Sequence, residues 1–373
     1  MADREAEARG LGNSQKVDQA LLGICSKIRS QKPAYPKGKK GECVLRLAIA
    51  IVVLAVVLCG QAYADNESSF KFSGYAQFRY TGGERASVDQ FSVRSIRPTF
   101  TGTLATPLPM SYACQLEAAG SGSTTVKLTD AFVDIRPEGW KLRIGQFKIP
   151  FGYDNPLGTP KRLEPEPALV IDTLFPGLRD QGLCASFPVG ADKTGLFTIG
   201  IVNGEGINRS DANSGKNIFL RLEGGKGNLH IGGSAYAGKQ GAAKGDENRY
   251  GVDFQWSTGQ IQVLGEYVSG EGWHQPPGVQ GYTAPASFNT LDFSGGYLSL
   301  YYQRSGSPHI GFIRYDTFDP DRDAGGNIVK TTTIGYAYEF AGLNRASIAY
   351  EARDNAATGS EDLVVAQFQV AWK

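Results

Sequence analysis

Residues 331–353 read TTTIGYAYEFAGLNRASIAYEAR, and the order of residue types in this stretch decides the fold. From Ile334 to Phe340 an aliphatic or aromatic residue stands at every second position, with a small or polar residue between. A short connection at 341–343 leads into a second alternating segment. Because successive side chains of a β-strand point to opposite faces of the sheet, the stretch predicts two antiparallel strands joined by a tight turn.

The same alternation recurs along the chain in short segments separated by Gly, Asn, Asp, Ser and Pro. Composition agrees, because 48 of the 373 residues are glycine and 11% are aromatic, whereas 2 are methionine. These residue types favour strands and turns over helices. The sequence therefore predicts an all-β fold of sixteen strands, at about 70–80, 89–104, 110–118, 126–136, 140–147, 179–187, 195–203, 216–223, 227–238, 248–256, 260–268, 292–303, 308–316, 331–340, 344–353 and 362–372.

Two β architectures fit this pattern. In a soluble sandwich or barrel the apolar faces meet inside, whereas in an outer-membrane barrel they contact lipid and the polar faces line a wet lumen. Connections that alternate between short (137–139, 341–343) and long (148–178, 269–291) favour the membrane barrel, as do the even strand number and aromatic strand ends. We therefore predict a 16-stranded antiparallel transmembrane β-barrel with short periplasmic turns and long external loops. It would lie in the bacterial outer membrane and enclose an aqueous channel.

Residues 1–64 differ in kind from the rest of the chain. Basic residues precede the uncharged apolar run Leu47–Cys59, and an A-x-A site that ends at Ala64 follows it. A positive end, a short apolar core and such a site are typical of a secretory signal peptide. We predict an N-terminal extension and signal peptide over 1–64, with cleavage after Ala64, and a barrel over 65–373. The alternative is a single transmembrane anchor, because Leu47–Ala64 is free of charge over 18 residues, close to the ~20 that span a bilayer.

Charge and composition exclude several classes of function. The 38 basic and 37 acidic residues nearly balance, and removal of the predicted leader would leave 28 against 32, a net charge of −4. Without a basic cluster we expect no nucleic-acid partner, and three His and five Cys lead us to expect no metal site and no cofactor. We expect no enzyme activity, because His230, His274 and His309, the candidates for a barrel lipase, lie on a polar face, in a long loop and at a strand start.

Basic residues fall on the polar faces of several predicted strands, where they would line the lumen. A guanidinium group offers bidentate donors to phosphate oxygens, and basic rings lower the cost of removing water from an anion. The alternative is that these residues pair with lumen carboxylates, such as Asp130 and Asp134 on a neighbouring strand. The candidate pore-lining and anion-binding residues are Arg97, Lys141, Arg143, Arg79, Arg221 and Arg314.

The connection at 148–178 is too long for a simple hairpin and is rich in proline. We predict that it folds inward and constricts the pore. Its charged residues would then face each other, with Lys148, Lys161 and Arg162 on one side and Glu164, Glu166 and Asp172 on the other. The alternative is an external lid over the mouth of the barrel.

Several motifs point to one family. The clearest are 130–134 (DAFVD) and 140–152 (WKLRIGQFKIPFG), and shorter ones are Arg94-x-x-Arg97, Arg179-Asp180-x-Gly182 and Arg314-Tyr315-Asp316. Together they resemble the outer-membrane phosphate-selective porin O/P family. The resemblance implies a homotrimeric porin with an anion preference, which contacts outer-membrane lipid and passes small anionic or polar solutes by passive diffusion. Because lumen positions carry both signs of charge, a weakly selective general porin is the alternative, ahead of a barrel enzyme or adhesin.

Overall fold

The computed structural model describes residues 67–86, 89–119, 126–175, 179–241, 245–272, 291–356 and 359–373. The predicted leader, residues 1–64, lies outside these ranges. Two helical segments occur in the described ranges, η1 (Thr159–Lys161) and α3 (Leu169–Leu174). No helix in this part of the chain has the length and apolar character needed to cross a membrane.

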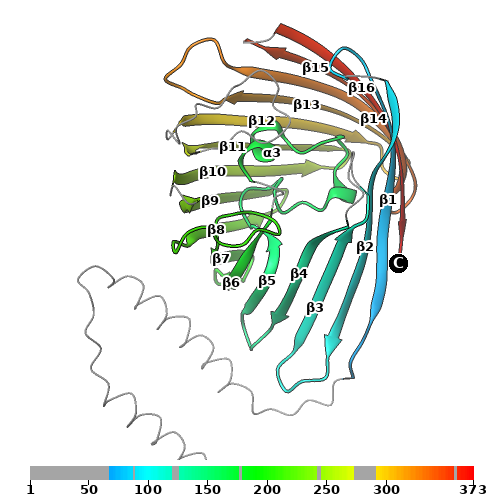
Figure 1. Cartoon of the computed structure of the whole chain (residues 1–373). Helices are drawn as coiled ribbons and strands as arrows, with labels where there is room; N and C mark the ends of the chain where they lie inside the picture. The colour runs from blue at the N-terminus through cyan, green and yellow to red at the C-terminus, as the bar shows by residue number, and fades with distance from the viewer. Residues whose placement is uncertain are drawn as a thin grey trace, which may run out of the picture. The chain divides into compact units, whose positions relative to one another are not determined.

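Sixteen antiparallel strands form a closed barrel in which each strand pairs with its sequence neighbours and β1 pairs with β16 (Figure 1). The predicted architecture is therefore confirmed. Some strands extend past their predicted ends, because backbone pairing continues beyond the alternating apolar positions; β10, for example, begins at Gly245 and is paired there with Gln240. The strands are β1 (Lys71–Gly82), β2 (Gln90–Leu104), β3 (Met110–Glu117), β4 (Lys127–Ile135), β5 (Lys141–Lys148), β6 (Arg179–Val189), β7 (Gly195–Val202), β8 (Asn217–Lys226), β9 (Leu229–Gln240), β10 (Gly245–Thr258), β11 (Ile261–Glu271), β12 (Asp292–Gln303), β13 (His309–Asp319), β14 (Val329–Ala341), β15 (Asn344–Asn355) and β16 (Gly359–Trp372).

The barrel carries its apolar side chains on the outside. On β14, Ile334 is 55% exposed and its neighbour Thr333 is 0% exposed, and on β16 Phe368 is 45% exposed while Gln369 is fully buried. A soluble barrel would show the opposite order, with apolar residues inside. The exterior is therefore suited to lipid, and the polar strand faces line the lumen.

The connections differ in length between the two ends of the barrel. β14 ends at Ala341 and β15 begins at Asn344, so two residues make the turn between them. The first, Gly342, has a φ of +59°, a left-handed conformation that glycine adopts without steric cost and that two-residue hairpins require. At the opposite end the connections are longer, as between Glu271 and Asp292.

Aromatic residues form a belt near the end of the barrel that carries the short turns. Phe72 of β1, Tyr302 of β12, Tyr336 and Phe340 of β14 are all exposed on the outer face. Phe72 packs near Trp372, and Phe340 packs edge-on against Phe368. Aromatic belts of this kind lie at the membrane–water interface of outer-membrane barrels.

Residues 149–175, here called the inner loop, leave the wall after β5 and lie within the ring of strands (Figure 1). Their apolar side chains form one buried cluster with side chains of the wall from β5 to β13. The wall contributes such residues as Val202, Phe219, Leu264 and Phe318. The inner loop therefore fills the lumen on that side of the barrel and leaves space on the side of β1, β2 and β14–β16. The loop members of the cluster are Ile149, Phe151, Ala168, Val170, Ile171, Leu174 and Phe175.

Candidate functional site: the channel beside the inner loop

Two cavities lie between the inner loop and the barrel wall. The external cavity has a volume of about 890 Å³ and lies toward the long connections, between the inner loop and strands β1, β2 and β13–β16. The deeper cavity, of about 200 Å³, reaches farther toward the short turns and includes Gln77 and Arg97 in its lining. Both cavities are lined by Arg94, Glu166 and Asp172. The two cavities therefore adjoin each other beside the inner loop, and together they are here called the channel.

A β-bulge directs Arg94 of β2 into the lumen. Gln77 of β1 is paired with Ser95, and the next residue, Phe78, is paired with Val93, so Arg94 has no cross-strand partner in this ladder. A bulge inserts one extra residue and changes the direction of its side chain. The guanidinium group of Arg94 consequently reaches the inner loop rather than the lipid.

Arg79 and Arg94 bind the carboxylate of Glu166 together. Arg79 Nη1 lies 2.5 Å from Glu166 Oε1, and Arg94 donates from Nε to Oε1 at 3.1 Å and from Nη2 to Oε2 at 2.8 Å. The two bonds from Arg94 form a bidentate pair, the strong geometry for a guanidinium and a carboxylate. Burial alone would raise the pKa of Glu166, but the charges of Arg94 and Arg79 outweigh it and lower the pKa to about 2. Glu166 is therefore ionised throughout the physiological pH range.

The backbone around Glu166 is held from two sides. Arg79 Nη2 donates to the carbonyl oxygen of Pro165 at 2.9 Å. From the far side, Arg314 of β13 donates to the carbonyl oxygens of Glu166 at 3.0 Å and Pro167 at 3.4 Å. Since proline fixes φ, the two prolines further restrict this segment. The inner loop is thus connected to both walls at the point where it borders the channel.

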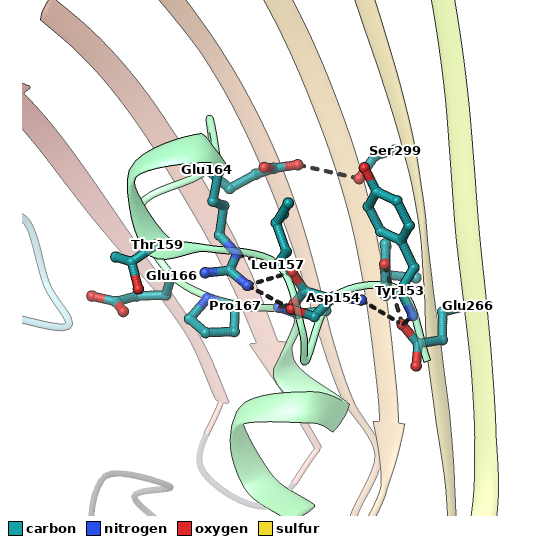
Figure 2. Close-up of polar contacts among 12 residues, drawn as sticks. Tyr153, Asp154, Leu157, Thr159, Glu164, Glu166, Pro167, Glu266 and Ser299 are labelled. Carbon is teal, nitrogen blue, oxygen red and sulfur yellow. Dashed lines mark hydrogen bonds and ion pairs between the residues drawn. The ribbon is translucent and has the colours of Figure 1, made fainter. Parts of the chain in front are cut away.

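Buried polar contacts fix the remainder of the inner loop. Arg162 donates from Nε and Nη2 to Asp154 Oδ1 at 3.0 and 2.5 Å, and Asp154 Oδ2 accepts the backbone N–H of Ala168 at 2.7 Å. Glu266 of β11 accepts the backbone N–H groups of Tyr153 and Asp154, both at 3.1 Å (Figure 2). These contacts join the two ends of the inner loop to each other and to the wall.

Glu164 and Glu166 point to opposite sides of the inner loop (Figure 2). Glu164 Oε1 accepts the hydroxyl of Tyr301 at 2.6 Å and that of Ser299 at 3.2 Å, both on β12. Glu164 therefore anchors the loop to one wall, and Glu166 contacts the arginines of the other wall.

Asp172 of α3 lines both cavities, and its side chain is exposed to the channel. In the described part of the chain its carboxylate has no recorded hydrogen-bond partner. The protein around the carboxylate removes part of its hydration, which disfavours the charged form, and the negative charge of Glu166 adds to this effect. The pKa of Asp172 is therefore raised to about 6. Two carboxylates of the same loop thus differ in pKa because arginine contacts one of them.

The predicted pore residues divide into two groups. Arg79, Arg97, Arg314, Arg162, Glu164, Glu166 and Asp172 line the channel. Lys141, Arg143, Arg221, Lys148 and Lys161 do not line either cavity.

The basic residues outside the channel lining have other surroundings. Arg143 donates to Asp134 at 2.7 and 2.9 Å and stacks over Phe132, and Arg221 donates to Asp253 and Glu223 at 2.6 to 3.0 Å. These are the lumen ion pairs considered as the alternative for such residues. Lys148 donates to the carbonyl oxygen of Leu157 at 2.6 Å, Lys161 is exposed, and Lys141 is half-buried on β5.

The predicted opposition of charges within the inner loop does not occur in that form. Arg162 binds Asp154 instead of the three predicted carboxylates, and Glu166 binds wall arginines instead of loop lysines. Within the channel lining, Arg97 binds Glu117 of β3 and donates to Thr159 Oγ1 at 3.1 Å. Charged contacts thus form between the loop and the wall, because strand register brings wall side chains toward the loop.

Four channel-lining arginines, Arg85, Arg94, Arg179 and Arg353, were not among the sequence-based candidates. Strict alternation from Arg97 places Arg94 on the lipid face, where an arginine costs about 2–4 kcal/mol near the bilayer midplane. A charged residue at a position that alternation assigns to the lipid face can therefore indicate a β-bulge. Arg353 shares the parity of Glu351 on β15, and its Nε lies 3.4 Å from Thr331 Oγ1.

Comparisons with known proteins agree with this architecture. The family model of phosphate-selective porin O and P matches residues 73–243, which extend from β1 past β9. The barrel is similar to the anion-selective porin from Comamonas acidovorans (TM-score 0.62, 13% identity) and to the trimer form of OmpT from Vibrio cholerae (TM-score 0.62, 12% identity); each alignment covers 82% of this chain and 100% of the other. It is also similar to the outer membrane channel DcaP of Acinetobacter baumannii (TM-score 0.60, 12% identity, 83% and 100% covered). A search of curated protein sequences finds no match. The closed sixteen-stranded barrel, its lipid-facing exterior and the family match over residues 73–243 identify the chain as an outer-membrane porin that is similar to the phosphate-selective porin O and P family.

Proposed function

We propose that this porin passes small hydrophilic solutes across the outer membrane by passive diffusion and prefers anions. The arginines on the β1–β2 wall support the preference, because Arg79, Arg94 and Arg97 lie along one side of the channel. Guanidinium groups in a narrow, partly desolvated passage attract anions and replace part of their hydration. The similar barrel from Comamonas acidovorans is described as anion-selective.

The balance of charge along the channel favours a moderate preference. Four arginines and three carboxylates line the deeper cavity: Arg94, Arg97, Arg162 and Arg179 against Glu164, Glu166 and Asp172. The external cavity is balanced at five and five: Arg79, Arg85, Arg94, Arg314 and Arg353 against Glu166, Asp172, Asp316, Glu351 and Glu361. The narrow part therefore carries the excess of positive charge, and the wide part carries none.

Three further assignments belong to this proposal. Residues 148–178 would form the constriction, because the described part of this segment borders both cavities. Residues 1–64 would be removed on export, and the mature barrel would assemble as a homotrimer in contact with outer-membrane lipid. The trimer form of the similar OmpT barrel supports the assembly. The channel requires no catalytic step and no cofactor.

The ion preference can be tested by substituting Arg94. In planar bilayers under a potassium chloride gradient, we expect the purified wild-type protein to show a reversal potential of the sign for chloride preference. Arg94→Gln should move it toward zero, because a positive charge leaves the narrow part of the channel. Arg209→Gln is the matched control, since Arg209 is exposed on the long connection between β7 and β8 and lines neither cavity. A wild-type reversal potential near zero would favour the weakly selective general porin, and a cation-selective one would contradict the proposal.

A further inference from the structure

The carboxylate of Glu166 occupies the position at which an anion in the channel would meet the arginine wall. Its two oxygens accept three hydrogen bonds, two from Arg94 and one from Arg79, and the same three residues border the external cavity. A carboxylate of the protein thus shows how the wall binds an oxyanion. Glu166 Oε1 is shared between both arginines, and Oε2 is bound by Arg94.

Arg79 is held in place by a second partner besides Glu166. Gln367 of β16 accepts hydrogen bonds from Arg79 Nε at 3.1 Å and from Arg79 Nη2 at 2.8 Å. Arg79 is buried, with 8% of its surface exposed, so its guanidinium group stays in place when its partner changes. The bulge fixes the backbone direction from which Arg94 extends.

The loop half can release the carboxylate without moving the loop. The carbonyl oxygens of Pro165, Glu166 and Pro167 are bound to Arg79 and Arg314. The side chain of Glu166 is held at its carboxylate by Arg79 and Arg94. Once these hydrogen bonds break, it can turn into the adjacent cavity by rotation about its own χ angles. Exchange of one bound carboxylate for another therefore requires a side-chain movement alone.

We propose that Arg79 and Arg94 form a binding site for oxyanions in the channel, and that Glu166 is an internal competitor that occupies this site between passing solutes. The inference rests on the proposed function, namely that anions enter the channel. A carboxylate or phosphate group can reproduce the two-oxygen geometry of Glu166, whereas chloride offers a single centre. The site thus distinguishes oxyanions from chloride.

Competition by Glu166 also accounts for release. Conduction requires that a solute bind well enough to enter and weakly enough to leave. A solute bound to the two arginines faces a tethered carboxylate at an effective concentration of millimolar order or higher. The returning side chain displaces the solute and restores the neutralised wall.

Glu166→Gln tests this assignment, because glutamine keeps the shape of the side chain and removes its charge. We would measure chloride current through single channels at pH 7.5 while inorganic phosphate or acetate is added. In the variant we expect either anion to reduce the chloride current by half at a concentration about tenfold lower than in wild type, because the competitor is lost. A stronger shift for phosphate than for acetate would assign the site to phosphate groups, and the reverse order would assign it to carboxylates.

Asp172→Asn is the matched control, since it removes one negative charge from the same cavities at a residue that forms no ion pair with an arginine of the described residues. It should change the reversal potential and leave the half-blocking concentrations within about twofold of wild type. Equal shifts in both variants would overturn the site and reduce the effect to net charge. Unchanged blocking in Glu166→Gln, in a wild-type background that is anion-selective, would also overturn it and leave the proposed function intact.

A second variant separates the loss of the contact with both arginines from the loss of the charge. Glu166→Asp keeps the charge but shortens the side chain by one methylene, so it cannot reach both arginines in the observed geometry. We expect half-blocking concentrations between those of wild type and Glu166→Gln. Barrel folding of each variant would be checked by its heat-modifiable migration in gels. Values for Glu166→Asp equal to wild type would contradict the requirement for contact with both arginines.

Discussion

Glu166 and Asp172 lie in the same loop and line the same two cavities, but their contacts with arginine differ. Arg79 and Arg94 contact Glu166, and in the described residues no side chain is recorded as a hydrogen-bond partner of Asp172. The pKa of Glu166 is accordingly lowered to about 2, and that of Asp172 is raised to about 6. Of these two carboxylates, Asp172 is thus the one whose charge changes within the pH range of a living cell's surroundings.

This difference predicts a pH-dependent ion preference. Asp172 is charged above its pKa and neutral below it, so lowering the pH from 7.5 to 5 removes a negative charge from the channel while Glu166 stays ionised. Arg94 and Arg162 oppose the upward shift, and Glu166 and Asp154 support it. The reversal potential should therefore move toward stronger anion preference as the pH falls. In Asp172→Asn it should be nearly constant over this range and close to the low-pH wild-type value; an equal pH response in that variant would refute the assignment.

At the scale of elements, the inner loop is held in the lumen by apolar packing as much as by charge. Phe151 is fully buried, lies 5.1 Å from the ring of Phe175 and packs beside Gly251 of β10. The polar contacts of Asp154 and Glu266 border this apolar region. The loop thus behaves as a small core placed inside the barrel, and loosening that core should free the loop.

Phe151→Ala tests the apolar contribution. Removing a buried phenylalanine typically costs about 3–5 kcal/mol of stability. Here we expect the loss to weaken the docking of the loop and to leave the barrel folded. We expect larger current fluctuations in the open channel and faster proteolytic cleavage within 149–175, with the barrel still folded. Phe340→Ala, on the lipid face of β14, is the control and should leave both readouts unchanged. Quiet, wild-type-like currents in Phe151→Ala would show that the polar contacts suffice.

At the scale of the whole molecule, the barrel depends on closure between its first and last strands. Gly74 of β1 is paired with Trp372 of β16, and the indole ring lies over the glycine. A Cβ at Gly74 would lie 2.5 Å from Trp372 Cζ2 and 2.6 Å from the backbone oxygen of Arg97. The second contact cannot be relieved by turning a side chain.

Gly74→Ala should therefore impair closure of the barrel. We expect a lower yield of the heat-modifiable folded form and a lower unfolding temperature than for wild type. Gly311→Ala on β13 is the matched substitution, because a Cβ there would have no neighbour within 4 Å. Equal folding yields for the two variants would show that the pairing of β1 with β16 accommodates the added methyl group without loss of stability.

The sequence allowed the barrel to be predicted because period-two alternation and connection length are local properties. Parity likewise placed Arg79 and Arg314 on the lumen face, where the structure has them. It failed for Arg94, since a bulge shifts parity by one residue and leaves no local mark apart from a charge in an apolar position. Partners such as Glu166 for Arg79 could not be predicted, because they are 87 residues apart and meet only after the inner loop has docked.

Because the inner loop packs against β6–β13, the channel lies to one side of the barrel, and the two sides of the wall have different roles. One flank is scaffold, where apolar residues of both partners must stay matched in size. The other flank, on β1, β2 and β14–β16, borders the two cavities, so a change to a side chain that faces them alters the path of the solute and leaves the apolar packing of the loop in place. Adaptation to a new nutrient, or resistance to a charged antibiotic, could therefore proceed through a few substitutions on that flank with the scaffold left intact.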